Sequence, residues 1–109
     1  MGLLKKINSW FHNQDRRAHV RYVVPRLIIT HDGVEYKTSD WSLGGFRLDD
    51  FEATLRIGKQ LEGEISLEGG EKGEFSAEII SIDASGYISV QFLAITPGVF
   101  LAMSGLSTL

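Results

Sequence analysis

Two short groups of polar residues stand out as the part of this chain whose residue types suit chemistry. They comprise Arg16, Arg17 and Arg21, followed by Asp40, Ser42, Gly44 and Gly45. Guanidinium groups bind phosphate oxygens in pairs, and the same planar fork matches the O6/N7 edge of guanine. A carboxylate accepts hydrogen bonds from the N1 and N2 donors of guanine, whereas adenine would leave it unpaired. Together the two groups predict a site for a guanine nucleotide.

The second group has a spacing that suits a strand end followed by a turn. Asp40 and Ser42 are two residues apart, so their side chains share one face of an extended strand. Gly45 has no side chain, which permits a positive φ and the close approach of a ligand. The alternation of Val34 and Tyr36 would turn Asp40 and Ser42 inward, so we expect a bulge or the strand end to rotate them outward. The alternative is that both polar residues only cap a turn.

Composition restricts the classes of protein to which the chain can belong. Its 109 residues, 43% hydrophobic, predict one small domain. The absence of cysteine excludes disulfides, thiolate metal sites and a cysteine nucleophile, and it fits a cytoplasmic location. The net charge of −3, with the cations gathered in the first quarter, favours a small anion over a nucleic-acid polymer. No apolar run is long enough to span a bilayer, and the first residues make a poor signal peptide.

The first element expected along the chain is a helix, which precedes both polar groups. Residues 1–13 have apolar residues at helical spacing and predict a short amphipathic helix that precedes the main domain, residues 14–109. This helix has three interpretations: it packs on the domain, binds a partner or lies on a membrane surface. Its apolar face is too short for stable membrane attachment alone.

The pattern after Tyr22 predicts six short strands separated by turns. The expected strands are 22–30, 34–41, 46–48, 61–67, 75–82 and 88–92. Asp32-Gly33 predicts a tight hairpin, and the parity change at Ile80 and Ile82 predicts a bulge. Pro97 suits a first helical turn, so we expect a short C-terminal helix over 99–106. This arrangement favours a small antiparallel barrel or sandwich.

The two polar groups also carry a resemblance to a known family. Arg17-Ala18-His19-Val20-Arg21 and Asp40-Trp41-Ser42-Leu43-Gly44-Gly45 resemble the RxxxR and D/NxSxxG motifs of PilZ domains. PilZ domains are six-stranded antiparallel β-barrels that bind the bacterial second messenger cyclic di-GMP, and the resemblance runs from about Gln14 to Leu93.

The resemblance implies a role for each site residue. Arg17 and Arg21 would bind phosphates and guanine, and Asp40 and Ser42 would recognise a guanine. The glycine at position 45 would shape the turn. An arginine just before the RxxxR motif, here Arg16, resembles the variant that accepts two stacked, intercalated cyclic di-GMP molecules.

We therefore expect a mainly β, six-stranded barrel with short N-terminal and C-terminal helices that acts as a cyclic di-GMP receptor. Binding would order the segment Arg16–Arg21 and signal to a partner protein, with no enzymatic activity and no cofactor. One alternative is an interaction module that binds no nucleotide, and another is a barrel for single-stranded nucleic acid, which the acidic balance disfavours. Trp41 is expected in the core, and the three histidines lack metal-ligand spacing.

Overall fold

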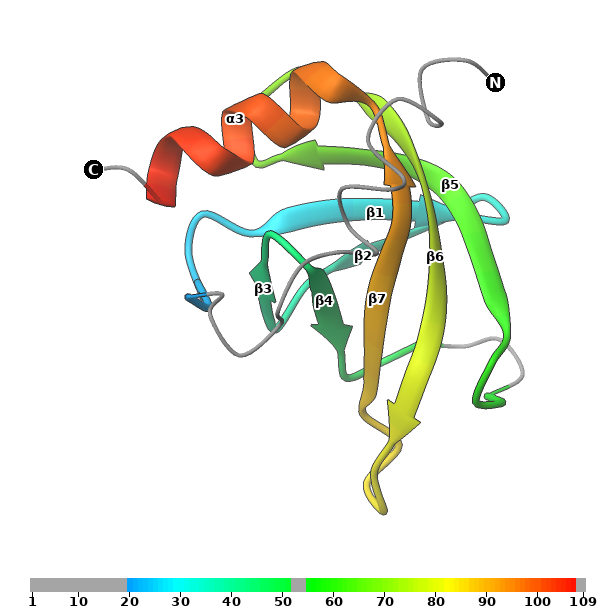
Figure 1. Ribbon diagram of the computed structural model, residues 1–109. Coiled ribbons are helices and arrows are strands. Elements are labelled where there is room, and N and C mark those ends of the chain that lie inside the picture. Colours follow the sequence, from blue (N-terminus) through cyan, green and yellow to red (C-terminus); the bar gives the residue numbers. More distant parts are fainter. Residues whose placement is uncertain (1–19, 52–54, 108–109) are drawn as a thin grey trace.

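The computed structural model describes residues 20–51 and 55–107, which form seven strands and one helix (Figure 1). The elements are β1 (Leu27–His31), β2 (Val34–Lys37), β3 (Asp40–Ser42), β4 (Gly45–Leu48), β5 (Gln60–Leu67), β6 (Gly73–Ile82), β7 (Ile88–Ile95) and α3 (Pro97–Ser107). The predicted helix over residues 1–13 lies outside the described residues.

All seven strands belong to one antiparallel sheet with the order β2-β1-β5-β6-β7-β4-β3. The sheet curls strongly, so that β1 and β2 run across the direction of the long β6 and β7, and α3 covers one end (Figure 1). The two edge strands, β2 and β3, are consecutive in the chain and are separated only by Thr38 and Ser39. The same stretch of chain therefore forms both edges of the curled sheet.

The backbone hydrogen bonds at Thr38 and Ser39 show how this stretch joins the two edges. The Thr38 N–H donates to the carbonyl of Leu27 in β1 at 3.1 Å, and the Ser39 N–H donates to the carbonyl of Arg47 in β4 at 2.9 Å. Successive amides of a strand point to opposite sides, so this bent segment bonds to β1 with its first half and to β4 with its second. The prediction of a mainly β antiparallel fold is confirmed. The count of seven strands instead of six arises because the predicted strand 34–41 is divided at this bend.

The core lies inside the curled sheet and is built on aromatic rings. Phe46 lies 5.8 Å from Phe75 and 5.6 Å from Phe92 between ring centroids. Trp41 is fully buried, which confirms its predicted place in the core. Burial of such large side chains is the main source of stability in a domain of this size.

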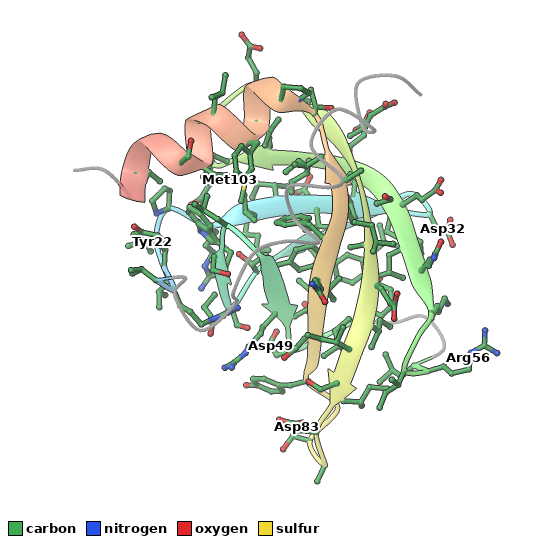
Figure 2. The ribbon with its side chains drawn as sticks, in the orientation of Figure 1. Tyr22, Asp32, Asp49, Arg56, Asp83 and Met103 are labelled. Atoms are coloured by element: carbon green, nitrogen blue, oxygen red, sulfur yellow. The ribbon has the colours of Figure 1, made fainter. Side chains whose placement is uncertain are left out.

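Local signals in the sequence are also confirmed. Asp32 and Gly33 have φ angles of 51° and 79°, as a tight hairpin requires. The β6–β7 register shifts between Ile79 and Ser81, where the parity change predicted a bulge. α3 begins at Pro97, and the side chain of Met103 points from it into the core (Figure 2).

Candidate functional site

The short segment of residues 20–26 carries one of the predicted arginines to the sheet. The Tyr22 N–H donates to the Trp41 carbonyl at 2.7 Å, and the Trp41 N–H donates back at 2.9 Å. The two rings are 4.8 Å apart between centroids, and Trp41 Nε1 donates to the carbonyl of Pro25 at 2.6 Å. A buried tryptophan of β3 thus attaches this segment to the sheet and places Arg21 beside β3.

Three residues predicted from the sequence meet here. Arg21 Nε donates to Asp40 Oδ1 at 2.7 Å, and Arg21 Nη2 lies 2.6 Å from the same oxygen. Arg21 Nη1 lies 3.5 Å from Ser42 Oγ. The Arg21 and Asp40 side chains are 39% and 21% exposed, so the pair faces solvent. An ion pair of this kind contributes only about 0–1 kcal/mol to stability, and a ligand can displace it at low cost.

The bend between β2 and β3 gives Asp40 its outward direction. Tyr36 and Thr38 are buried, as the alternation along β2 predicts. The alternation then shifts, so that Trp41 becomes the next buried residue and Asp40 stays partly exposed. This shift is the outward rotation predicted for Asp40. The same prediction is wrong for Ser42, which is buried at the end of β3.

Leu43 and Gly44 form the turn between Ser42, which ends β3, and Gly45, which begins β4. Ser42 is buried, and its Oγ accepts a hydrogen bond from the Gly44 N–H at 3.2 Å, so it caps the turn while also facing Arg21. A Cβ atom on Gly45 would lie 1.8 Å from the carbonyl oxygen of Val90 in β7. The close approach of β4 to β7 therefore requires glycine at position 45, and its φ is not positive.

Arg47 is a site residue that the sequence analysis missed. It lies directly opposite Asp40 in the β3–β4 pair, and its Nη1 is 3.6 Å from Asp40 Oδ2. Its side chain is 48% exposed. A signal existed, because a two-residue turn between Ser42 and Gly45 sets the register that pairs residue 40 with residue 47. Two guanidiniums around one carboxylate leave an excess of positive charge, which favours an anionic ligand.

Arg16 and Arg17 lie outside the described residues. The cluster that the structure brings together therefore consists of Arg21, Asp40, Ser42 and Arg47. Beside it, Val20, Val23 and Val24 are 62%, 60% and 71% exposed, which is unusual for three apolar residues so close in the chain.

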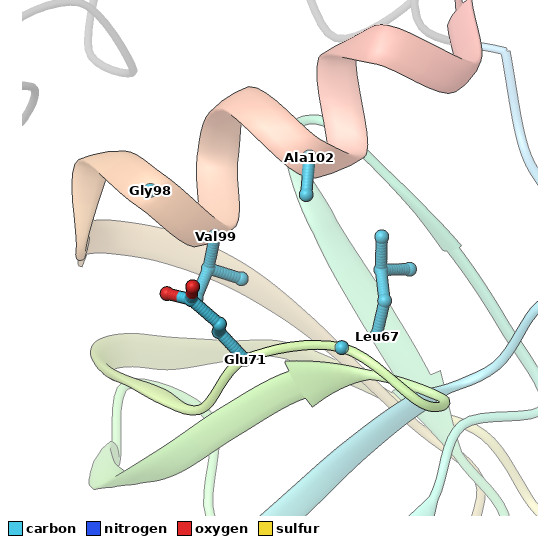
Figure 3. A pocket seen from close by; sticks show the side chains of 6 residues that line it. Leu67, Glu71, Gly98, Val99 and Ala102 are labelled. Carbon is cyan, nitrogen blue, oxygen red and sulfur yellow. The ribbon is translucent and has the colours of Figure 1, made fainter.

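A groove of about 380 Å³ lies elsewhere, between α3 and the β5–β6 turn (Figure 3). It is lined by Leu67, Gly70, Glu71, Gly98, Val99 and Ala102. None of these six side chains is cationic, and the Glu71 carboxylate would repel a phosphate. This groove is unsuited to a nucleotide, so the cluster at Asp40 remains the candidate site.

Residues 20–51 and 55–107 contain no metal site, no reactive histidine and no membrane-spanning helix. No group of three or more His, Asp or Glu side chains there is placed to hold a metal ion. His31 Nδ1 lies 2.8 Å from the Glu62 carbonyl, and its ring lies 5.6 Å from that of Phe51, so this histidine is part of the packing. Within the same residues, α3 is the only helix, and it falls short of the length needed to cross a membrane.

Comparison with known proteins identifies the family of the chain but no individual relative. No curated protein matches the chain. The sequence model of the PilZ domain matches residues 15–102, a span that includes both arginine positions of the first motif and the whole segment from Asp40 to Gly45. This match covers most of the chain, which therefore belongs to the PilZ domain family.

Proposed function

We propose that this protein is a cytoplasmic receptor for cyclic di-GMP that signals to a partner protein and catalyses no reaction. The observation that carries the proposal is the convergence of Arg21 and Arg47 on the carboxylate of Asp40, with Ser42 Oγ facing Arg21. Membership of the PilZ family supports the choice of ligand. The cluster supplies cations for phosphates and an acceptor for the donor edge of guanine.

The contacts of Arg21 suggest how ligand binding changes the protein. Both Nε and Nη2 of Arg21 contact one oxygen of Asp40, which fills the same acceptor that guanine N1–H and N2–H require. Guanine and Arg21 therefore compete for Asp40. When the base binds, Arg21 moves to a phosphate, and the ligand drives this change by its greater affinity for the second arrangement.

This exchange alters a surface that a partner protein can bind. Arg21 belongs to the segment that exposes Val20, Val23 and Val24. Ordering of residues 16–21 over the nucleotide repositions these three valines relative to the sheet. Exposed apolar side chains beside a charged site are suited to protein recognition, so the conformation of this segment reports whether ligand is bound.

The motif assigns further contacts to the two arginines that precede this segment. We propose that Arg17 binds phosphate and guanine together with Arg21, and that Arg16 allows two intercalated cyclic di-GMP molecules to bind. The Gly44 N–H donates to Ser42 Oγ, so Gly44 supports the site by holding the Ser42 hydroxyl in place.

Isothermal titration calorimetry tests the proposal directly. The wild-type protein should bind two cyclic di-GMP molecules, and Arg16→Leu should reduce the ratio to one. Arg17→Ala and Asp40→Ala should each weaken binding by about a hundredfold, because each removes charge-assisted hydrogen bonds that contribute about 1.5–3 kcal/mol apiece. Glu71→Ala, in the groove beside α3, is the control and should leave the affinity unchanged. Unchanged affinity in either site variant would remove the assignment of that residue.

A second candidate is an interaction module that binds no nucleotide. It is favoured by one observation: Asp40 and Ser42 already have partners in Arg21 and Gly44, as residues that only fix a turn would have. The absence of heat on titration of the wild-type protein with cyclic di-GMP would select this alternative.

A further inference from the structure

Asp40 and Arg47 leave an acceptor and a donor side by side at the centre of the site. The two contacts from Arg21 go to Asp40 Oδ1, whereas Oδ2 faces only Arg47. The 3.6 Å between Oδ2 and Arg47 Nη1 is too long for a hydrogen bond. Among the described residues, no hydrogen bond engages either Oδ2 or the Arg47 guanidinium. Both groups are therefore available to a ligand that bridges them.

The order of these groups matches the pairing edge of guanine. That edge presents an acceptor, O6, next to the N1–H donor and the N2–H donor. A donor from Arg47 followed by the two oxygens of Asp40 is the complementary order. We propose that Arg47 determines base specificity by donating to O6 of the guanine whose N1 and N2 hydrogens bind Asp40. This inference rests on the proposed function and adds a residue that the family motifs do not contain.

The backbone holds Arg47 firmly in the required position. Its carbonyl accepts hydrogen bonds from the Ser39 N–H at 2.9 Å and from Ser39 Oγ at 3.1 Å. Its two neighbours in β4, Phe46 and Leu48, are buried in the core, so Arg47 alone of these three points outward. Because the backbone is already fixed, recognition of a base edge has to order only the arginine side chain itself.

Arg47 would also reject adenine. At the position of guanine O6, adenine carries the N6 amino group, which is a donor. The Arg47 guanidinium has only donors, so the two groups cannot form a hydrogen bond, and the carboxylate of Asp40 meets an acceptor at N1. The pair therefore opposes adenine at two adjacent atoms.

A double-mutant cycle between protein and ligand tests the assignment. Arg47→Gln is combined with a cyclic di-GMP analogue in which sulfur, a weaker acceptor, replaces O6 of both guanines, and calorimetry gives the four affinities. Arg47→Gln should bind cyclic di-GMP about tenfold more weakly, the loss expected for one good base contact. The analogue should bind wild-type protein more weakly than cyclic di-GMP does, whereas the Arg47→Gln variant should bind both ligands within about twofold.

Lys37→Gln provides the matched control, because it removes one exposed positive charge from β2, where Lys37 pairs weakly with Glu68 at 3.9 Å. It should leave both affinities unchanged, and a thermal melt confirms that each variant is folded. If the sulfur analogue weakens binding to Arg47→Gln by the same factor as binding to the wild-type protein, Arg47 does not contact O6. That result would indicate a contact between Arg47 and a phosphate instead. If Arg47→Gln binds cyclic di-GMP as tightly as the wild-type protein does, the inference about Arg47 is wrong but the proposed function stands. Failure of the wild-type protein to bind cyclic di-GMP would overturn the proposed function and the inference with it.

Discussion

The two sides of the candidate site differ in how the rest of the molecule holds them. Asp40, Ser42 and Arg47 lie in the β3–β4 hairpin, which three register pairs join internally and four further pairs join to β7. Arg21 lies in residues 20–26, which reach β3 through the bridge between Tyr22 and Trp41 and through the hydrogen bond from Trp41 Nε1 to the Pro25 carbonyl. One side of the site is therefore fixed in the sheet by continuous strand pairing, and the other is attached by a few isolated contacts.

This difference assigns separate tasks to the two sides. Recognition of a base edge needs donors and acceptors held at set positions, which the hairpin provides. A response to the ligand needs an element with two arrangements of similar free energy, and local stability is lowest where few backbone hydrogen bonds and few buried contacts exist. Arg21 is suited to the second task because its ion pair with Asp40 is exposed and can be exchanged for a phosphate.

The largest expected effect breaks the fixed side. Gly45→Val introduces a Cβ 1.8 Å from the Val90 carbonyl, so β4 and β7 must separate. We expect the free energy of unfolding, measured by urea denaturation, to fall by about 3–5 kcal/mol, at the upper end for single substitutions. Gly98→Ala is the control, because no atom lies within 4 Å of its Cβ position, and it should be neutral or slightly stabilising. Equal stability of the two variants would show that β4 does not depend on this close approach.

The sequence predicted the strands of the fold but not the bend that positions the candidate site. The arginine motif and the Asp40–Ser42 spacing pointed to Arg21, Asp40 and Ser42, which the structure places in contact although Arg21 and Asp40 are 19 residues apart. The bend at Thr38 and Ser39 is different. It exists because one stretch of chain must bond to both edges of a curled sheet, and that requirement is set by the whole fold.

Arg47 shows the same limit at the level of one residue. Its place opposite Asp40 follows from the length of the turn between β3 and β4, which depends on how Gly45 approaches β7. Arginine in a strand is commonly a solvated residue on the outer face. Only the register distinguishes this one from such a residue, and register is poorly determined by the sequence of a single strand.

An effect of intermediate size is expected in hydrogen exchange, which observes both sides of the site in one sample. Amide hydrogen exchange of the free protein should be fast for residues 20–24 and slow for residues 45–48, all of which pair with β7 and the first three of which also pair with β3. Cyclic di-GMP should slow exchange in residues 20–24 by about tenfold or more, because the bound ligand should raise the free energy of local opening in this segment by at least about 1.4 kcal/mol. Exchange in residues 45–48 should change little. Equal slowing of both segments would show that the two sides respond as one unit.

The smallest expected effect concerns Ser42, whose hydroxyl contacts both sides. Ser42 Oγ accepts from the Gly44 N–H at 3.2 Å on the fixed side and lies 3.5 Å from Arg21 Nη1 on the other. Ser42→Ala should lower the free energy of unfolding by about 1 kcal/mol, since a buried N–H loses its acceptor, and should weaken cyclic di-GMP binding by about threefold. Thr96→Ala is the matched control: the Thr96 hydroxyl also accepts from a backbone N–H, that of Glu74 at 2.8 Å, and it has no contact with Arg21. It should therefore cost similar stability without the loss of affinity. If both variants bind cyclic di-GMP equally well, Ser42 only caps the turn, and its contact with Arg21 makes no contribution to ligand binding.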